Sequence, residues 1–251
     1  MEHDTNLPSE EIQLPDSWAR FSLIAGAVGL VAMIAAIGLG QGSKDFSFSY
    51  LTAYFYWLTI ALGGLFFVLL HYLARSGWSV VVRRLAEHVM GTLPLFALLF
   101  IPIALGTHDL YHWTHPEEVA KDDLLQHKLP YLNLPFFYAR SAFYLVVWTA
   151  LSVYFWRQSA SQDESGDPEI TRRLHSRSAL GMVLFAVTAT FASFDWVMTL
   201  EPHWFSTIFG VYVFAGCVVS ILSVVILVVL RLKSAGALTS VVTWEHFHDL
   251  G

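Results

Sequence analysis

Cysteine is almost absent from this sequence. Cys217 is its only cysteine, and it lies within a long apolar run. A single thiol excludes an intrachain disulfide, a cysteine-ligated iron–sulfur cluster and the C-x-x-C-H attachment of a haem. We therefore expect this chain to bind no redox cofactor and no metal of its own, and we assign no catalytic residue.

Charged residues are also scarce. They make up 14% of the chain against 55% for apolar residues, and the mean hydropathy is +0.54. Soluble proteins are usually about one quarter charged, so composition alone indicates a membrane protein. The formal net charge of −6 gives no reason to expect a nucleic-acid partner.

Lysine and arginine are missing before Arg20, where the chain carries carboxylates instead. A secretory signal peptide begins with a basic region, which this stretch does not have. We expect residues 1–19 to form a solvated acidic tail that meets the membrane near Trp18.

Six apolar segments are each long enough to span about 30 Å of hydrocarbon at about 1.5 Å per residue. They cover residues 21–39, 50–73, 89–105, 134–156, 178–200 and 205–230, and the third begins interfacially near residue 80. Open strands cannot satisfy their backbone in lipid, so we predict an all-α polytopic transmembrane bundle of about six helices over residues 20–231. A bend is expected at 91–94, and the polar residues 159–170 are predicted to form a mobile connection.

Lysine and arginine are unevenly divided between the two sides of this bundle. One side carries Arg75, Arg83, Arg84, Arg157, Arg172, Arg173, Arg177, Arg231 and Lys233, and the other carries Lys44, Lys121 and Lys128. Basic residues are enriched in cytoplasmic connections. The N-terminus, the arginine-rich connections and residues 232–251 are therefore predicted to be cytoplasmic, and the long loop 107–133 to lie outside.

The outer loop 107–133 contains a plausible helix start at Pro116. Val119, Leu124 and Leu125 would give that helix a weak apolar face, and a solvated loop is the alternative. The loop is also rich in histidine, with His108, Asp109, His112 and His115 close in sequence. Their spacing matches no standard zinc pattern, so no metal site is predicted.

A polar turn joins the last two predicted helices. Residues 191–210 run from apolar sequence through Asp195 to Glu201 and His203, and then return to apolar sequence. Asp195 lies inside the apolar part, where a charge is costly unless it is paired or hydrated. An intramembrane acid of this kind is a candidate for proton transfer.

One face of the predicted helix 178–200 is small and hydroxylic. At steps of three and four residues it carries Ser178, Gly181, Phe185, Thr188, Ala192 and Asp195. Such a face packs against another helix and can also line a water-filled path between helices. Thr188 is therefore, like Asp195, a candidate for proton transfer. The alternative is an Asp195 that pairs at the interface with no transport role. We predict that Arg140 pairs with Asp195 or with Asp109, because a lone buried arginine needs a carboxylate.

Titratable residues also gather near the cytoplasmic ends of the second and third predicted helices. His71 ends one of these helices, and Glu87 and His88 lie about one turn inside the other. Together they suggest a proton entry cluster or, less strongly, a bis-histidine haem. For Glu87 the alternative is an ordinary charged group at the membrane surface.

Two long stretches carry a resemblance to a known family. Residues 49–94 read SYLTAYFYWLTIALGGLFFVLLHYLARSGWSVVVRRLAEHVMGTLP, and residues 193–216 read SFDWVMTLEPHWFSTIFGVYVFAG. Both resemble the second polysulfide-reductase-like (NrfD-like) membrane subunit of bacterial alternative complex III, a quinol:electron-acceptor oxidoreductase. Members of that family continue with further helices, so we expect residues 241–251 to lead into a helix beyond this sequence.

The resemblance implies a function and a set of partners. It implies a subunit of the bacterial inner membrane that holds no haem or cluster itself and contributes a proton path. The path is carried onto His71, Glu87, His88, Asp195, Glu201 and His203, with Thr188 between them and Asp109 and Arg140 as outer support. The implied partners are an iron–sulfur subunit, multihaem cytochrome c subunits, a second NrfD-like subunit and a terminal oxidase. A contact with quinone or menaquinone is left open, and the alternative function is a purely structural membrane anchor.

Overall fold

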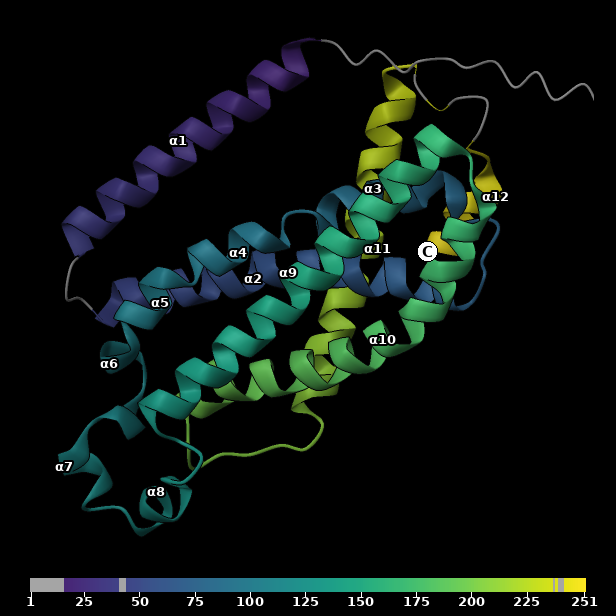
Figure 1. The fold of residues 1–251 in the computed structure, drawn as a ribbon. Coiled ribbons are helices and arrows are strands. Elements are labelled where there is room, and N and C mark those ends of the chain that lie inside the picture. The colour runs from purple at the N-terminus through teal and green to yellow at the C-terminus, as the bar shows by residue number, and fades with distance from the viewer. Residues whose placement is uncertain (1–15, 41–43, 237, 239–241) are drawn as a thin grey trace, which may run out of the picture. The chain divides into compact units, whose positions relative to one another are not determined.

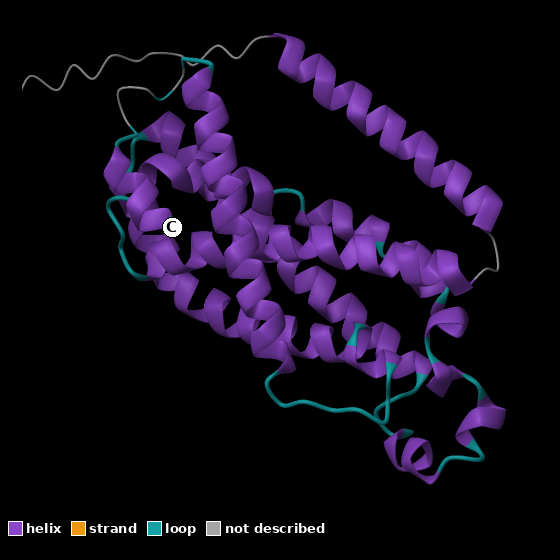
Figure 2. Ribbon diagram, turned by 180° about the vertical axis from the view of Figure 1, so that it is seen from behind, coloured by secondary structure: helices purple, strands orange, loops and turns teal. Residues whose placement is uncertain are grey.

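The computed structural model describes residues 16–40, 44–236, 238 and 242–251, and in this part of the chain every regular element is a helix (Figures 1 and 2). The all-α prediction is therefore confirmed. The chain divides into two units, Met1–Gly42 and Ser43–Gly251. The first unit contains helix α1 (Asp16–Gly40), and most of the predicted acidic tail lies outside the described residues.

Among the residues that the structure describes, six helices are long and apolar enough to cross a membrane, so the chain is a multi-pass membrane protein. They are α1, α2 (Lys44–Leu73), the broken span Val80–Leu105, α9 (Leu134–Ser165), the span Pro168–Leu200 that begins with α10 (Pro168–Trp196), and α11 (Phe209–Ser234). Two short helices, η2 (Met198–Leu200) and α12 (Trp244–Leu250), follow α10 and α11 in turn.

Helix α2 lies at the centre of the second unit, where α3, α10 and α11 pack against it. Adjacent glycines permit two of these contacts. A side chain at Gly63 would lie 2.3 Å from the carbonyl oxygen of Cys217 on α11, and one at Gly64 would lie 3.0 Å from that of Ala86 on α3. At each contact the backbone of α2 can approach the backbone of its neighbour so closely only because glycine places no Cβ between them.

The third span is interrupted at the predicted bend. Helix α3 (Val80–Met90) ends before Gly91, and α4 (Leu93–Leu99) and α5 (Ile101–Leu105) continue the crossing. Pro94 and Pro102 supply no N–H and so interrupt the hydrogen-bond ladder. Tyrosines of neighbouring helices donate to carbonyls along this segment: Tyr54 to Phe96, Tyr50 to Leu99 and Tyr138 to Ala104. Exposed backbone acceptors inside the bilayer are thereby satisfied.

The predicted mobile connection at 159–170 is wrong. Helix α9 continues to Ser165 and α10 begins at Pro168, so only Gly166 and Asp167 join them. Gly166 adopts φ 64°, which glycine reaches without a steric penalty, and Asp167 accepts a hydrogen bond from the backbone N–H of Glu169 at 2.9 Å. The polar residues mark the point where α9 leaves the apolar region, whereas the helix itself continues.

The outer loop folds into four short helical segments. They are α6 (Thr107–Leu110), η1 (His112–Thr114), α7 (Pro116–Val119) and α8 (Asp123–Lys128). The predicted helix start at Pro116 is confirmed. Val119 and Leu125 are buried, but Leu124 is exposed because α8 is a separate helix with its own rotation.

Candidate functional site

Asp195 is fully buried at the end of α10 and forms the predicted pair with Arg140. The Arg140 guanidinium donates from Nε to Oδ2 at 2.8 Å and from Nη2 to Oδ1 at 2.9 Å. Tyr144 Oη donates to Oδ2 at 2.7 Å. A planar guanidinium suits this two-pronged contact, which compensates much of the cost of burying the carboxylate.

Aromatic rings hold Arg140 in place. Its guanidinium carbon lies 3.8 Å from the ring centre of Tyr131 and 4.2 Å from that of Phe136. Arg140 Nη1 also donates to the carbonyl of Tyr131 at 3.0 Å. Burial first, and then the negative charge of Asp195, raise the pKa of Tyr131, so this phenol stays neutral.

Asp109 takes no part in this pair. It is half-buried after the third span, and no ion pair joins it to Arg140 within the described residues. Its helix α6 turns away after Gly106, which breaks the line of the span. Of the two predicted alternatives, the structure forms the one with Asp195.

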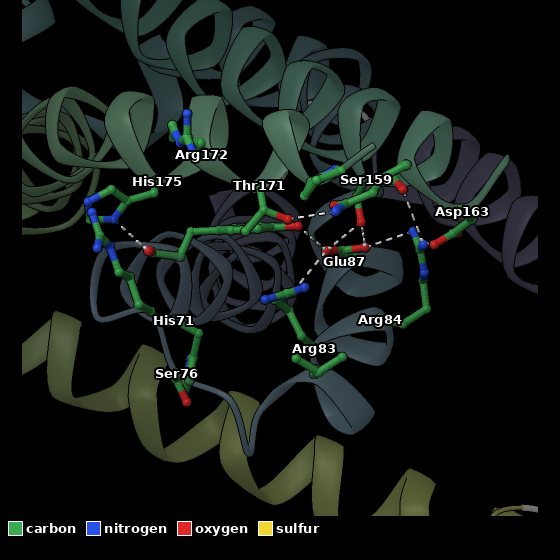
Figure 3. Close-up of a pocket in the computed structure, with 15 residues that line it drawn as sticks. His71, Ser76, Arg83, Arg84, Glu87, Ser159, Asp163, Thr171, Arg172 and His175 are labelled. Atoms are coloured by element: carbon green, nitrogen blue, oxygen red, sulfur yellow. Dashed lines mark hydrogen bonds and ion pairs between the residues drawn. The ribbon is translucent and has the colours of Figure 1, made fainter. Parts of the chain in front are cut away.

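Glu87 is the second buried carboxylate, and it lies on α3. Arg84 Nη1 lies 2.8 Å from Oε2, and Arg83 Nε lies 3.6 Å from Oε1. Ser159 Oγ on α9 lies 2.9 Å and 2.8 Å from the two oxygens, and Tyr72 Oη lies 3.4 Å from Oε1. Figure 3 shows Arg83, Arg84 and Ser159 converging on Glu87.

Glu87 opens into a polar cavity of about 630 Å³ between α2, α3, α9 and α10. His71, Arg75 and Arg172 line the same cavity, together with His175, which the sequence analysis did not single out. Arg84 also pairs with Asp163, so a carboxylate of α9 closes one side. The Glu87 site is therefore a polar cavity lined by charged side chains, whereas the Asp195 site is packed by aromatic rings.

The two histidines of the cavity share one arrangement. His71 Nδ1 lies 2.7 Å from the carbonyl oxygen of Phe67, and His175 Nδ1 lies 3.0 Å from that of Tyr72. A carbonyl oxygen can only accept, so the Nδ1 that faces it carries the proton in each neutral ring and leaves Nε2 as a proton acceptor.

His88 does not join this cavity. Its side chain is exposed, and its Nδ1 bonds the carbonyl oxygen of Arg84 at 2.6 Å. One residue further along a helix is about 100° further round its axis, so His88 turns outward where Glu87 turns inward. The structure therefore does not bring His88 to His71, and the suggested bis-histidine haem has no support.

A continuous helix contact joins the two carboxylate sites. The predicted face of α10 is buried throughout, and α9 opposes it with a buried face of its own. That face consists of Ser141, Tyr144, Trp148, Ser152, Phe155 and Ser159. The spacing of three and four residues in the sequence could have identified this face of α9. Its aromatic residues, however, are equally typical of an ordinary hydrophobic core.

Thr188 lies midway along this contact and accepts a hydrogen bond from the indole N–H of Trp148 at 2.8 Å. Closer to Asp195, the indole of Trp196 donates to Ser141 Oγ at 2.9 Å. From Arg140 to Ser159 the helix rises about 28 Å at about 1.5 Å per residue, which is close to the thickness of the hydrocarbon.

Glu201 and His203 form a separate cluster with the outer loop. His203 Nε2 lies 2.6 Å from Asp122 Oδ2, and His203 Nδ1 lies 3.4 Å from Glu201 Oε1. Desolvation by itself would raise the pKa of Asp122. The hydrogen bond from the backbone N–H of Leu125 and the contact with His203 outweigh it, so the pKa of Asp122 is lowered. No hydrogen bond or ion pair between described residues links this cluster directly to the carboxylate of Asp195.

The histidines of the outer loop form no metal centre in the described part of the chain. His108 and His115 stack with ring centres 3.9 Å apart. Their rings lie face to face, an arrangement that does not converge their nitrogens on one ion.

An apolar groove of about 610 Å³ runs between α2 and α11, close to Val197 and Leu200. It suits the tail of a quinone or lipid. The threonines in its wall, Thr52 and Thr59, donate to their own helix backbone. None of the described residues that line it is an acid or a histidine, so it provides no base for the protons that quinol releases.

The chain matches no family model and no curated protein. Its function is therefore inferred from its residues and their geometry.

Proposed function

We propose that this chain is a membrane subunit of a quinol:electron-acceptor oxidoreductase of the alternative complex III type, and that it contributes a proton path. The observation that carries the proposal is the pair of buried carboxylates, Glu87 and Asp195, at opposite ends of one polar helix contact. Intramembrane acids are costly, and they mark proton relays in many membrane proteins.

The path begins at the Glu87 cavity. Water in this cavity reaches Glu87 and the acceptor nitrogens of His71 and His175, so these groups collect the proton. Along the α9–α10 contact the hydroxyls of Ser178 and Thr188 donate to their own helix, to His175 and Leu184 respectively. Water therefore has to complete each link between them. Asp195 receives the proton when Arg140 or Tyr144 moves.

The surroundings follow from the same proposal. In this proposal the chain lies in the bacterial inner membrane, with the N-terminus and the Glu87 cavity on the cytoplasmic side and Asp195 and the outer loop on the other, because basic connections favour the cytoplasm. Partner subunits carry the iron–sulfur clusters and haems, and a second NrfD-like subunit oxidises the quinol. The apolar groove between α2 and α11 has no base among the described residues that line it, so in this proposal the chain contacts the tail of a quinone there and does not itself oxidise the quinol.

A structural anchor is the second candidate, and the Asp195 site itself favours it. Both oxygens of this carboxylate are bonded to Arg140, and Tyr144 fills a further acceptor position. A carboxylate so fully bonded gives up its partners reluctantly, which suits a fixed joint between α9 and α10.

The purified complex in liposomes separates the two functions. Asp195→Asn and Glu87→Gln keep the size of each side chain but remove its proton-carrying group. A proton path predicts that either change lowers the number of protons moved per electron by at least about half, while quinol oxidation continues. Glu117→Gln and Glu164→Gln, exposed acids at the two ends, are the matched controls.

An unchanged proton-to-electron ratio in both variants, with a normal subunit complement, would reject the proton path and support the anchor. A complex that loses subunits in Asp195→Asn alone would also point to the anchor. Glu87→Gln then remains informative, because Arg84 and Ser159 still have an amide oxygen to bond.

A further inference from the structure

The cavity beside Glu87 carries more positive than negative charge. Arg75, Arg83, Arg84 and Arg172 line it, whereas its carboxylates are those of Glu87 and Asp163. Glu87 is neutralised by the arginines of α3, and Asp163 by one of the same pair. The remaining two arginines bring charge that the carboxylates of the cavity do not balance.

Arg75 occupies an unusual backbone position. It has φ 51° where α2 ends, and the N–H of Ser76 closes that end on the carbonyl of His71 at 3.0 Å. Helices that end in this left-handed position usually have glycine there. Here Arg75 occupies it, and the nearest glycine, Gly77, follows two residues later. A large cationic side chain is thus held at the mouth of the cavity in a conformation that disfavours it, which is typical of functional positions.

Arg172 stands at the mouth from the side of α10. Its Nη1 lies 3.0 Å from Glu169 Oε2, and its side chain is 79% exposed, so the other guanidinium nitrogens remain available. A guanidinium binds two oxygens of a phosphate at once, which an ammonium group does not do in the same fixed geometry.

The rest of the cavity suits a phosphate ester. Thr171 contributes a hydroxyl group, whose oxygen accepts from Gln162 and whose hydrogen can donate to a phosphate oxygen, and the volume of about 630 Å³ exceeds that of a phosphate alone. The cavity lies where α9 ends and α10 begins, beyond the apolar part of both helices. Basic pockets between membrane helices at this level bind the headgroups of anionic lipids.

We propose that this cavity binds a phosphate group through Arg75 and Arg172, with the group supplied by an anionic phospholipid or by free phosphate. The proposal does not depend on the proton path. It requires charge at the mouth of the cavity, and neither arginine is a member of the path.

The test compares the purified complex carrying Arg75→Asn together with Arg172→Gln with the unaltered complex. Asn is chosen because it tolerates the left-handed backbone. Arg157→Gln with Arg173→Gln is the matched control, because it removes the same charge from exposed positions at the same end but outside the cavity. The probes are phosphatidylglycerol in phosphatidylcholine nanodiscs, measured by native mass spectrometry, and inorganic phosphate, measured by calorimetry.

Each arginine near an anionic headgroup contributes about fivefold to binding, so the double variant should bind about twenty-five-fold more weakly than the unaltered protein. If phosphatidylglycerol shows this loss and inorganic phosphate shows no binding, the ligand is a lipid. If inorganic phosphate binds and shows the loss, the ligand is free phosphate. Equal binding by the double variant, the control and the unaltered protein with both probes overturns the proposal.

Discussion

At the scale of single residues, the two buried carboxylates differ in access. Glu87 lines a polar cavity and accepts a hydrogen bond from the hydroxyl of Ser159 at 2.9 Å. Asp195 is held by Arg140 and Tyr144 among aromatic rings. On the proposed proton path, a carboxylate beside a cavity takes up a proton with little rearrangement. A carboxylate held among rings needs a conformational step, so Asp195 is the better place for a gate on that path.

Asp122 gives a prediction for pH. Its folded pKa lies below the ordinary value of 3.8, because Leu125, His203 and Leu124 together outweigh desolvation. Its contribution to the loop is therefore complete above the ordinary pKa and is lost as pH falls through the lower, folded value. Hydrogen exchange of residues 112–128, corrected for intrinsic rates, should stay slow from neutral pH to about pH 4 and rise below it.

Asp122→Asn is the variant that checks this cause. It should show faster exchange already at neutral pH, because a neutral amide oxygen is a weaker hydrogen-bond acceptor for His203 than the carboxylate is. Glu117→Gln lies in the same loop and should keep the pH dependence of the unaltered protein. A loop that loosens at the same pH in Asp122→Asn as in the unaltered protein would contradict the assignment.

At the scale of elements, the Gly63 contact between α2 and α11 gives a packing prediction. Gly63→Ala places a methyl 2.3 Å from the carbonyl oxygen of Cys217, so the two helices must separate. Overpacking of this kind costs about 1–3 kcal/mol. Cys217 is buried and should react with a maleimide only when heating opens this contact. The temperature at which the labelled Cys217 peptide appears should therefore be lower in Gly63→Ala.

Gly216→Ala is the control for this change, since a Cβ at Gly216 meets no atom within 4 Å. It should leave the reaction temperature of Cys217 unchanged or raise it slightly, because alanine favours a helix over glycine. Equal effects of Gly63→Ala and Gly216→Ala on the reaction temperature of Cys217 would contradict a close approach of α2 and α11 at Gly63.

The sequence predicted these elements better than it predicted their ends and their partners. Hydropathy located every span, and proline and glycine located the break after α3, because both signals are local. The end of α9 was missed since polar residues continue a helix as readily as they end it. The pairing of Ser159 with Glu87 joins positions 72 residues apart, and no local pattern specifies that distance.

At the scale of the whole second unit, the polar sites lie at the ends of the α9–α10 contact and aromatic rings fill its middle. Trp148 and Trp196 have ring centres 5.7 Å apart and lie nearly perpendicular. Such packing leaves little space for a standing column of water, so a proton path here has to open transiently. A path that opens only in step with the chemistry of partner subunits would couple proton movement to electron transfer.

The placement of the two ends across the membrane is the last prediction. Glu117→Cys in the outer loop and Glu164→Cys near the end of α9 are exposed positions with one membrane crossing between them. Cys217 is buried and should add little background. In spheroplasts, an impermeant maleimide should label Glu117→Cys at once and Glu164→Cys only after permeabilisation, because arginine-rich connections remain in the cytoplasm.

Two results would contradict this arrangement in different ways. Labelling of Glu164→Cys but not Glu117→Cys in closed spheroplasts would invert the orientation and place the Glu87 cavity outside, which would reverse the direction of the proposed proton path. Labelling of both from one side would mean that α9 does not cross the bilayer. The second result would be harder to reconcile with the structure, because a helix of 32 residues rises about 48 Å and its apolar part alone is long enough to span.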